Sequence, residues 1–283
     1  MKSNYNMEAR QQLRLTPAYL LLILWLIYCL VSIGWIFCAS FSTTREIFSN
    51  TLLKSGIHFE NYIEAWVNSN VARYFFNSII YTCCSSVGII LIGAPAAYVI
   101  GRKVFRGRKA LVNTFLISMS IPTVMIVIPM YSVMAQINMV GNMATLIILY
   151  IAANVPFTVY FLTSFFATLP QALEEAAQID GCSQSRAFWQ IILPLAQPGI
   201  ITVSIFNFMN IWNEYFIALI FANKTEIRSL SIGLQSIIQS MRYTGDWAGL
   251  FAAVVIVFLP TFILYLLLSD KIIAGVTGGA VKG

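Results

Sequence analysis

The chain has 283 residues, of which 59% are hydrophobic and only 10% are charged, and its formal net charge at pH 7 is +6. Because soluble domains carry about 25% charged residues, this composition excludes an ordinary water-exposed globule. The basic residues flank apolar runs and form no separate basic domain. The positive charge therefore indicates helix orientation in a membrane rather than a nucleic-acid partner.

Six apolar segments follow one another along the chain, at residues 17–40, 74–100, 111–133, 143–166, 198–221 and 249–269. Each is about long enough to cross a bilayer, which takes about 20 residues, and each is expected to be helical because an open strand leaves backbone groups unpaired in lipid. The first segment is too long for the apolar core of a signal peptide and is interpreted as a retained span. The sequence thus predicts an all-α membrane protein with six transmembrane helices, forming a single domain over residues 1–283.

The lysines and arginines predict the orientation of these helices. Eleven of the 17 basic residues lie in the N-terminal segment, the even-numbered connections and the C-terminal tail, and five of them are packed into the sequence GRKVFRGRKA at 101–110. Since cytoplasmic flanks are enriched in Lys and Arg, both termini are expected to face the cytoplasm. The connection at 167–197 is then also cytoplasmic.

Motifs for catalysis and metal binding are missing from the sequence. It contains no G-x-x-x-x-G-K-[ST] loop, H-E-x-x-H or G-x-S-x-G, and its single His and its five Cys, which show no C-x-x-C spacing, predict no metal site or cofactor. No catalytic residue is expected. If the protein drives transport, the energy must come from an ion gradient or from another subunit.

The connection at 167–197 is a polar stretch with the pattern of a short helix and a turn. Pro170 suits a first helical turn, and Glu174 and Glu175 lie near the positive end of the helix dipole. Gly181 can take the left-handed conformation that ends a helix. These residues predict a first helical limb with an acidic surface.

A second limb follows, and its apolar residues Phe188, Trp189 and Ile191 require a cover. An interfacial helix lying on lipid would present Lys and Arg to the anionic leaflet, whereas the first limb is acidic. The pattern therefore favours a cytoplasmic helix-turn-helix that docks on a protein.

The spacing within this connection resembles a known motif. Glu175-Ala176-Ala177 is followed after three residues by Gly181, and after nine more by Ile191-x-Leu193-Pro194. This pattern resembles the EAA loop of binding-protein-dependent ABC importer permeases. The surrounding sequence, the WNEYF segment at 212–216 and the tail AGVTGGAVKG are similar to the carbohydrate-type subgroup, typified by the maltose importer. Cys182 departs modestly from the small Ala that many members have there.

The resemblance implies a set of partners. These are a second homologous permease subunit in a heterodimer, two cytoplasmic ATP-binding subunits, an extracellular or periplasmic solute-binding protein and a carbohydrate substrate, in a bacterial or archaeal plasma membrane. The loop would insert into a cleft on the ATPase, where Glu175 would pair with a basic residue. The coupling residues implied are Glu174, Glu175, Ala176, Ala177, Asp180, Gly181, Phe188, Ile191, Leu193 and Pro194.

Four polar residues lie inside the fifth predicted span: Asn207, Asn210, Asn213 and Glu214. At helical spacing they occupy about a third of the circumference, and a carboxylate at that depth normally faces protein or a water-filled cavity. They are interpreted either as part of the substrate pathway, where Asn can bind sugar hydroxyls, or as a hydrogen-bonded seam against the second permease. The recurrence of Trp-Asn-Glu in the carbohydrate-type subgroup favours the seam or a gate.

Two other functions remain alternatives. An ion-coupled secondary transporter could use Glu214, although paired half-repeats with broken helices are not evident. An ABC importer for a polyol or a glycerol phosphate would share all of the features above.

Overall fold

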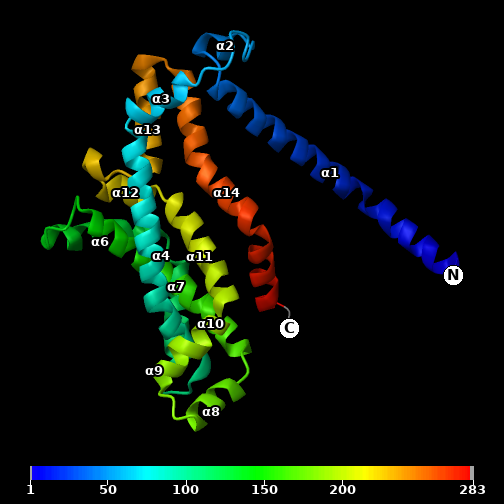
Figure 1. The fold of residues 1–283 in the computed structure, drawn as a ribbon, viewed down its shortest axis with the longest axis vertical. Helices are drawn as coiled ribbons and strands as arrows, with labels where there is room; N and C mark the ends of the chain where they lie inside the picture. Colours follow the sequence, from blue (N-terminus) through cyan, green and yellow to red (C-terminus); the bar gives the residue numbers. More distant parts are fainter. Residues whose placement is uncertain (1, 281–283) are drawn as a thin grey trace. The chain divides into compact units, whose positions relative to one another are not determined.

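The computed structural model describes the backbone of residues 2–280 and the side chains of residues 15–241 and 243–271. Every regular element of this part of the chain is a helix (Figure 1). The helices are α1 (Lys2–Ser40), α2 (Thr44–Phe48), α3 (Glu60–Val67), α4 (Val71–Arg102), α5 (Arg108–Ser120), α6 (Thr123–Gln136), α7 (Met143–Thr168), α8 (Ala172–Ile179), α9 (Gln184–Ala187), a π-helical turn (Phe188–Ile192), α10 (Leu193–Leu195), α11 (Gln197–Trp212), α12 (Phe216–Phe221), a 3₁₀ turn (Thr225–Ile227), α13 (Leu230–Thr244) and α14 (Trp247–Ala280).

The helices divide into two compact units, which we describe separately. One comprises residues 2–69 and 237–256, and the other comprises residues 70–236 and 257–280. Both functional regions discussed below lie in the second unit. Helices α13 and α14 each begin in one unit and end in the other.

Four helices of the described chain are long and apolar enough to cross a membrane: Leu15–Ser40, Val71–Arg102, Met143–Thr168 and Trp247–Lys271. Two further spans are counted if each of two bent helix pairs is one span. The predicted all-α membrane fold is therefore confirmed, with four to six candidate spans in place of six uniform ones.

The predicted span at 111–133 is two helices rather than one. Helices α5 and α6 meet at an angle of 100°. Ile121 and Pro122 between them are extended, with ψ of 120° and 131°. Because a proline disfavours helical geometry in the residue before it and cannot donate a backbone hydrogen bond, the helix ends at Ser120 and restarts at Thr123.

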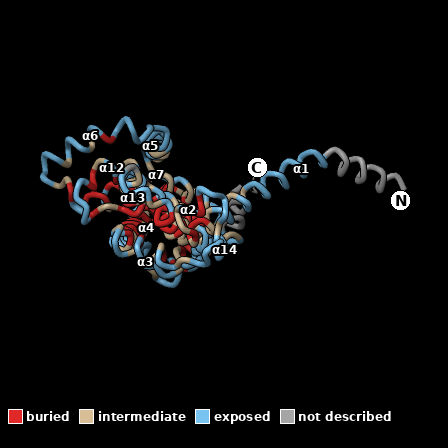
Figure 2. The backbone as a smooth tube through the Cα atoms, turned by 90° about the horizontal axis from the view of Figure 1, so that it is seen from above, coloured by how far each residue is buried: buried red, intermediate tan, exposed pale blue. Residues whose placement is uncertain are grey.

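The core of the second unit forms where α4 packs along α7. Figure 2 shows red, buried positions along α4, whereas α5 and α6 are almost wholly exposed. Two glycines of α4 allow close approach: a Cβ on Gly93 would lie 2.9 Å from the Thr158 Cγ2 atom, and one on Gly101 would lie 2.9 Å from the Thr163 carbonyl oxygen. These distances are too short for any side chain, so the two helices are held closely together.

The first unit is organised by a capping box at the start of α2. The Thr43 hydroxyl accepts from the Glu46 amide, and the Glu46 carboxylate accepts from the Thr43 amide at 2.9 Å. The same carboxylate also accepts from the amide and hydroxyl of Ser55, at 2.5 and 2.8 Å. Glu46 thereby joins the helix start to the following loop.

We expect the contribution of Glu46 to stability to depend on pH. Hydrogen bonds, chiefly from the Thr43 amide and then from the Ser55 hydroxyl, lower the pKa of Glu46 from 4.5 to about 2. Because the folded-state pKa is lowered, this contribution is fully present above pH 4.5 and is lost as the pH falls through about 2. Thermal unfolding of wild type and Glu46→Gln should differ at pH 6 and converge at about pH 2, whereas the exposed Glu64→Gln control should match wild type throughout. A difference between wild type and Glu46→Gln that persists unchanged at the lowest pH would contradict this assignment.

Candidate functional sites

Residues 167–197 contain two short helical limbs joined by a tight turn. The first limb is α8, which ends at Ile179 with Asp180 as its C-cap, and Gly181 follows with a φ of +71°. The second limb starts at Ser183, whose hydroxyl accepts from the Arg186 amide, and continues through α9 and the π-helical turn to α10. The glycine is required at the turn because a side chain is strained at that φ.

The ten predicted coupling residues separate into two groups by exposure. Glu175, Ala176, Asp180, Gly181 and Pro194 are exposed, whereas Glu174, Ala177 and Phe188 are buried, and Ile191 and Leu193 are half-buried. The structure therefore brings together an outward face that includes Glu175 and an inward face that includes Glu174. The neighbouring Glu174 and Glu175 differ because successive residues on a helix point about 100° apart.

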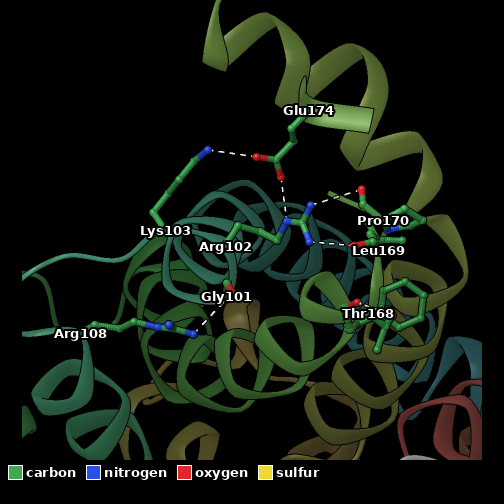
Figure 3. Close-up of polar contacts among 9 residues, drawn as sticks. Gly101, Arg102, Lys103, Arg108, Thr168, Leu169, Pro170 and Glu174 are labelled. Atoms are coloured by element: carbon green, nitrogen blue, oxygen red, sulfur yellow. Dashed lines mark hydrogen bonds and ion pairs between the residues drawn. The ribbon is translucent and has the colours of Figure 1, made fainter. Parts of the chain in front are cut away.

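Glu174 is held by two cations from the end of α4 (Figure 3). Arg102 Nε lies 2.7 Å from Glu174 Oε1, and Lys103 Nζ lies 3.0 Å from Glu174 Oε2. The Arg102 guanidinium also donates to the carbonyls of Leu169 and Pro170, at 2.7 and 3.3 Å. One arginine thus binds the segment between α7 and α8 as well as α8 itself.

This pairing keeps Glu174 ionised. Burial by itself would raise the pKa of Glu174, but the hydrogen bonds and charges of Arg102 and Lys103 together outweigh it and lower the pKa below its usual value. The pairing also raises the pKa of Lys103, chiefly through its hydrogen bond to Glu174. The contacts of Glu174 are directed into its own subunit.

The inward face of the second limb is held by aromatic packing. Phe188 lies with its ring centroid 5.0 Å from that of Tyr98 and 6.2 Å from that of Phe166, which come from α4 and α7. Trp189, its neighbour, is 44% exposed. The buried ring fixes the second limb to the α4–α7 pair.

Sequence reasoning missed three residues of this region. Arg102 and Lys103 were used only to orient the helices, and Ile179 was not selected although it is 86% exposed at the end of α8. The signal for Arg102 was its position at the end of a predicted span on the same side as an acidic loop. The ion pair between Arg102 and Glu174 depends on the packing of α4 against α7, because α8 directly follows α7 in the chain.

Within the fifth predicted span, the Glu214 carboxylate caps the start of α12. The span is interrupted between Trp212, where α11 ends, and Phe216, where α12 begins. The Glu214 carboxylate accepts from the amides of Ile217 and Ala218, at 2.6 and 3.0 Å, and from the Tyr150 hydroxyl at 3.0 Å. Because Ile217 and Ala218 are buried at the start of a helix, where backbone amides have no intrahelical acceptor, a side-chain acceptor is needed there.

Asparagine side chains connect α11 to α7 by hydrogen bonds at two places. Asn207 Nδ2 donates to the Thr158 hydroxyl at 3.0 Å, and Asn210 Nδ2 donates to Asn154 Oδ1 at 2.7 Å. Asn154 in turn donates to the Tyr150 carbonyl at 2.8 Å. Asn207 is buried within the subunit, whereas Asn210 and Asn213 are exposed.

A cavity of about 420 Å³ lies beside these hydrogen-bonded asparagines. It is lined by four asparagines, two phenylalanines and a methionine: Asn154, Asn207, Asn210, Asn213, Phe157, Phe206 and Met209. The rings of Phe157 and Phe206 meet edge to face, with their centroids 5.9 Å apart. Amide groups beside aromatic faces can bind a ligand that is polar at its edge and apolar on its face.

Comparison with known proteins identifies the family. Residues 89–274 match the model of the family described as "Binding-protein-dependent transport system inner membrane component". The diacetylchitobiose uptake system permease protein NgcG of Streptomyces coelicolor is 34% identical over 266 residues, which are 94% of this chain and 88% of that protein. The trehalose transport system permease protein SugB of Mycobacterium tuberculosis is 29% identical, over 90% of this chain and 93% of that protein.

A solved structure has the same fold. It is described as a bacterial ABC transporter involved in the import of the acidic polysaccharide alginate, and one of its chains matches with a TM-score of 0.78 and 22% identity. The match covers 89% of this chain and 94% of that chain. The family match and the similarity to NgcG establish that the chain belongs to the family of binding-protein-dependent transport system inner membrane components, the integral membrane permeases of ABC importers.

Proposed function

We propose that this permease carries a sugar or an oligosaccharide into the cell. It forms half of the pathway, pairs with a second, homologous permease, and receives substrate from a solute-binding protein outside the membrane. The relatives named for diacetylchitobiose and trehalose support a carbohydrate substrate. The amide and aromatic lining of the cavity beside α11 is consistent with such a ligand.

The loop at 167–197 is the proposed contact with a separate ATPase subunit. The observation that carries this proposal is the exposed face formed by Glu175, Ala176, Asp180 and Gly181 on a base that is fixed by Arg102 and Phe188. Ile179 adds an exposed apolar side chain to this face. A rigid, partly apolar surface with two acidic groups, Glu175 and Asp180, suits a cleft that holds a basic residue.

The loop and both termini are proposed to be cytoplasmic, because 11 of the 17 basic residues lie on that side. Cys182 reports on this orientation. In a variant that keeps only this cysteine, an impermeant maleimide should label inverted vesicles and leave intact cells unlabelled. Labelling of intact cells would reverse the orientation.

Asn213 is the proposed contact with the substrate, whereas Asn207 and Glu214 hold the subunit together. Asn213→Leu should raise the apparent KM for uptake about fivefold, the value of one net hydrogen bond of about 1 kcal/mol, and should leave co-purification of the second permease unchanged. Asn113→Leu, at an exposed position of α5, is the control. A loss of the second permease with no change in KM would assign Asn213 to the subunit seam instead.

Reconstitution tests the function as a whole. The chain should co-purify with an ATPase subunit, and hydrolysis should rise when the solute-binding protein is added with diacetylchitobiose, trehalose or melibiose. A response only to a polyol or glycerol phosphate would change the substrate class. Uptake that persists with a catalytically inactive ATPase would replace the proposal by an ion-coupled transporter.

A further inference from the structure

We propose that Arg102 is a positioning residue for energy coupling, and that it makes α8, α4 and α7 move as one body. This proposal rests on the proposed docking of the loop on an ATPase and names the residue that passes the resulting displacement to the membrane helices. The proposal is based on the position of the Arg102 guanidinium, which contacts both Leu169, directly after α7, and Glu174 on α8 (Figure 3).

The contacts of Arg102 join three elements. Arg102 is the last residue of α4, its Nη1 atom donates to the carbonyl of Leu169 directly after α7, and its Nε atom donates to Glu174 on α8. Nη2 adds a bond of 3.3 Å to the Pro170 carbonyl. A planar guanidinium with several fixed donors can hold these acceptors in one geometry, which a lysine cannot do.

Glu174 is buried and Arg102 is largely so, which distinguishes the pair from a surface ion pair. The side chains of Arg102 and Glu174 are 9% and 8% exposed, whereas that of Lys103 is 30% exposed. Solvent weakens exposed pairs, but removal of one partner from a buried pair leaves the other charge without compensation. Arg102 is therefore the principal anchor, and Lys103 is a weaker one.

Helix α8 depends on this anchor. It has eight residues, and only Glu174 and Ala177 of them are buried. So short a helix has little stability of its own and takes its position from tertiary contacts. Loss of Arg102 should free α8 to move relative to α4 without unfolding the helices of the membrane segment.

The α4–α7 pair that receives the displacement is closely packed at the same end. A Cβ on Gly101 would meet the Thr163 carbonyl at 2.9 Å, and the rings of Tyr98 and Phe166 lie 5.9 Å apart. Closely packed interiors transmit strain because their side chains have no room to absorb it. A force on α8 would therefore shift α4 and α7 together, as long as Arg102 connects them.

The experiment measures how strongly the binding of nucleotide to the ATPase changes the accessibility of the cavity beside α11. Asn213→Cys, in a chain whose five native cysteines are replaced, reports on the cavity through its rate of alkylation by a maleimide. The complex with its ATPase is assembled in nanodiscs, and the rate is compared without nucleotide and after trapping with MgATP and vanadate. ATP hydrolysis is measured on the same samples.

In the complex that Arg102→Gln forms with the ATPase, we expect the nucleotide-dependent change in alkylation to be reduced at least about fivefold, the lower end of typical coupling between sites. Arg106→Gln removes the same charge from an exposed position of the same connection and should behave as wild type. Arg102→Lys should retain part of the change, since it keeps the charge but not the contacts to both carbonyls.

A nucleotide-dependent change of wild-type size in Arg102→Gln would overturn the proposal. If Arg102→Gln does not assemble with the ATPase, Arg102→Lys is used for the test. A reduced nucleotide-dependent change in its alkylation rate supports the proposal, and a change of wild-type size overturns it. Failure of the unmodified chain to bind an ATPase or to respond to MgATP would instead refute the proposed function.

Discussion

Replacement of Glu214 by Ala is expected to lower the free energy of unfolding by about 2–5 kcal/mol. The carboxylate serves the amides of Ile217 and Ala218 and the hydroxyl of Tyr150. Without it, these donors remain unpaired at buried positions, where water cannot replace the acceptor. Denaturant unfolding of the purified permease in micelles measures the difference.

Glu214→Gln should cost less than Glu214→Ala, because the amide keeps one oxygen acceptor. Glu226→Gln, at an exposed position of the 3₁₀ turn, is the matched control and should be neutral. If Glu214→Ala unfolds as wild type does, the capping role is wrong. If Glu214→Ala has normal stability but no transport activity, Glu214 belongs to the substrate or ion pathway instead.

The second large effect is expected at Glu175. Charge reversal by Glu175→Arg should reduce affinity for the ATPase subunit at least about 30-fold, since an unpaired charge at a buried interface costs about 2–5 kcal/mol or more. Glu175 is exposed in the permease, so thermal unfolding of the permease alone should not change. Binding of the purified ATPase to the permease in nanodiscs measures the effect.

The control for Glu175 is Glu64→Arg, an equal charge change at an exposed position of α3 outside the loop. An acidic substitution at the basic partner on the ATPase should restore binding to Glu175→Arg. Wild-type binding by Glu175→Arg would exclude Glu175 from the contact. The contrast with the buried Glu174, whose partners lie in the same chain, makes this outcome informative.

The sequence by itself determined the class of the protein and the places where its chain must turn. Long apolar runs predict helices because an open strand would leave backbone groups unpaired in lipid. Gly181 at positive φ and the Ser183 cap agree with local rules, since such features depend only on a few neighbouring residues. The family resemblance likewise rested on spacing within one segment.

The tertiary structure alone decided which polar residues face inward. Glu174 and Glu175 are equivalent in sequence, but only Glu174 meets Arg102, from a helix about 70 residues earlier. Glu214 suits a pathway or a seam by sequence, and the break at 213–215 gives it a local role as well, because its carboxylate accepts from two amides at the start of α12. Periodicity carries no information on contacts between distant helices, and the role of a buried charge is fixed by its partner, so these assignments required the packed fold.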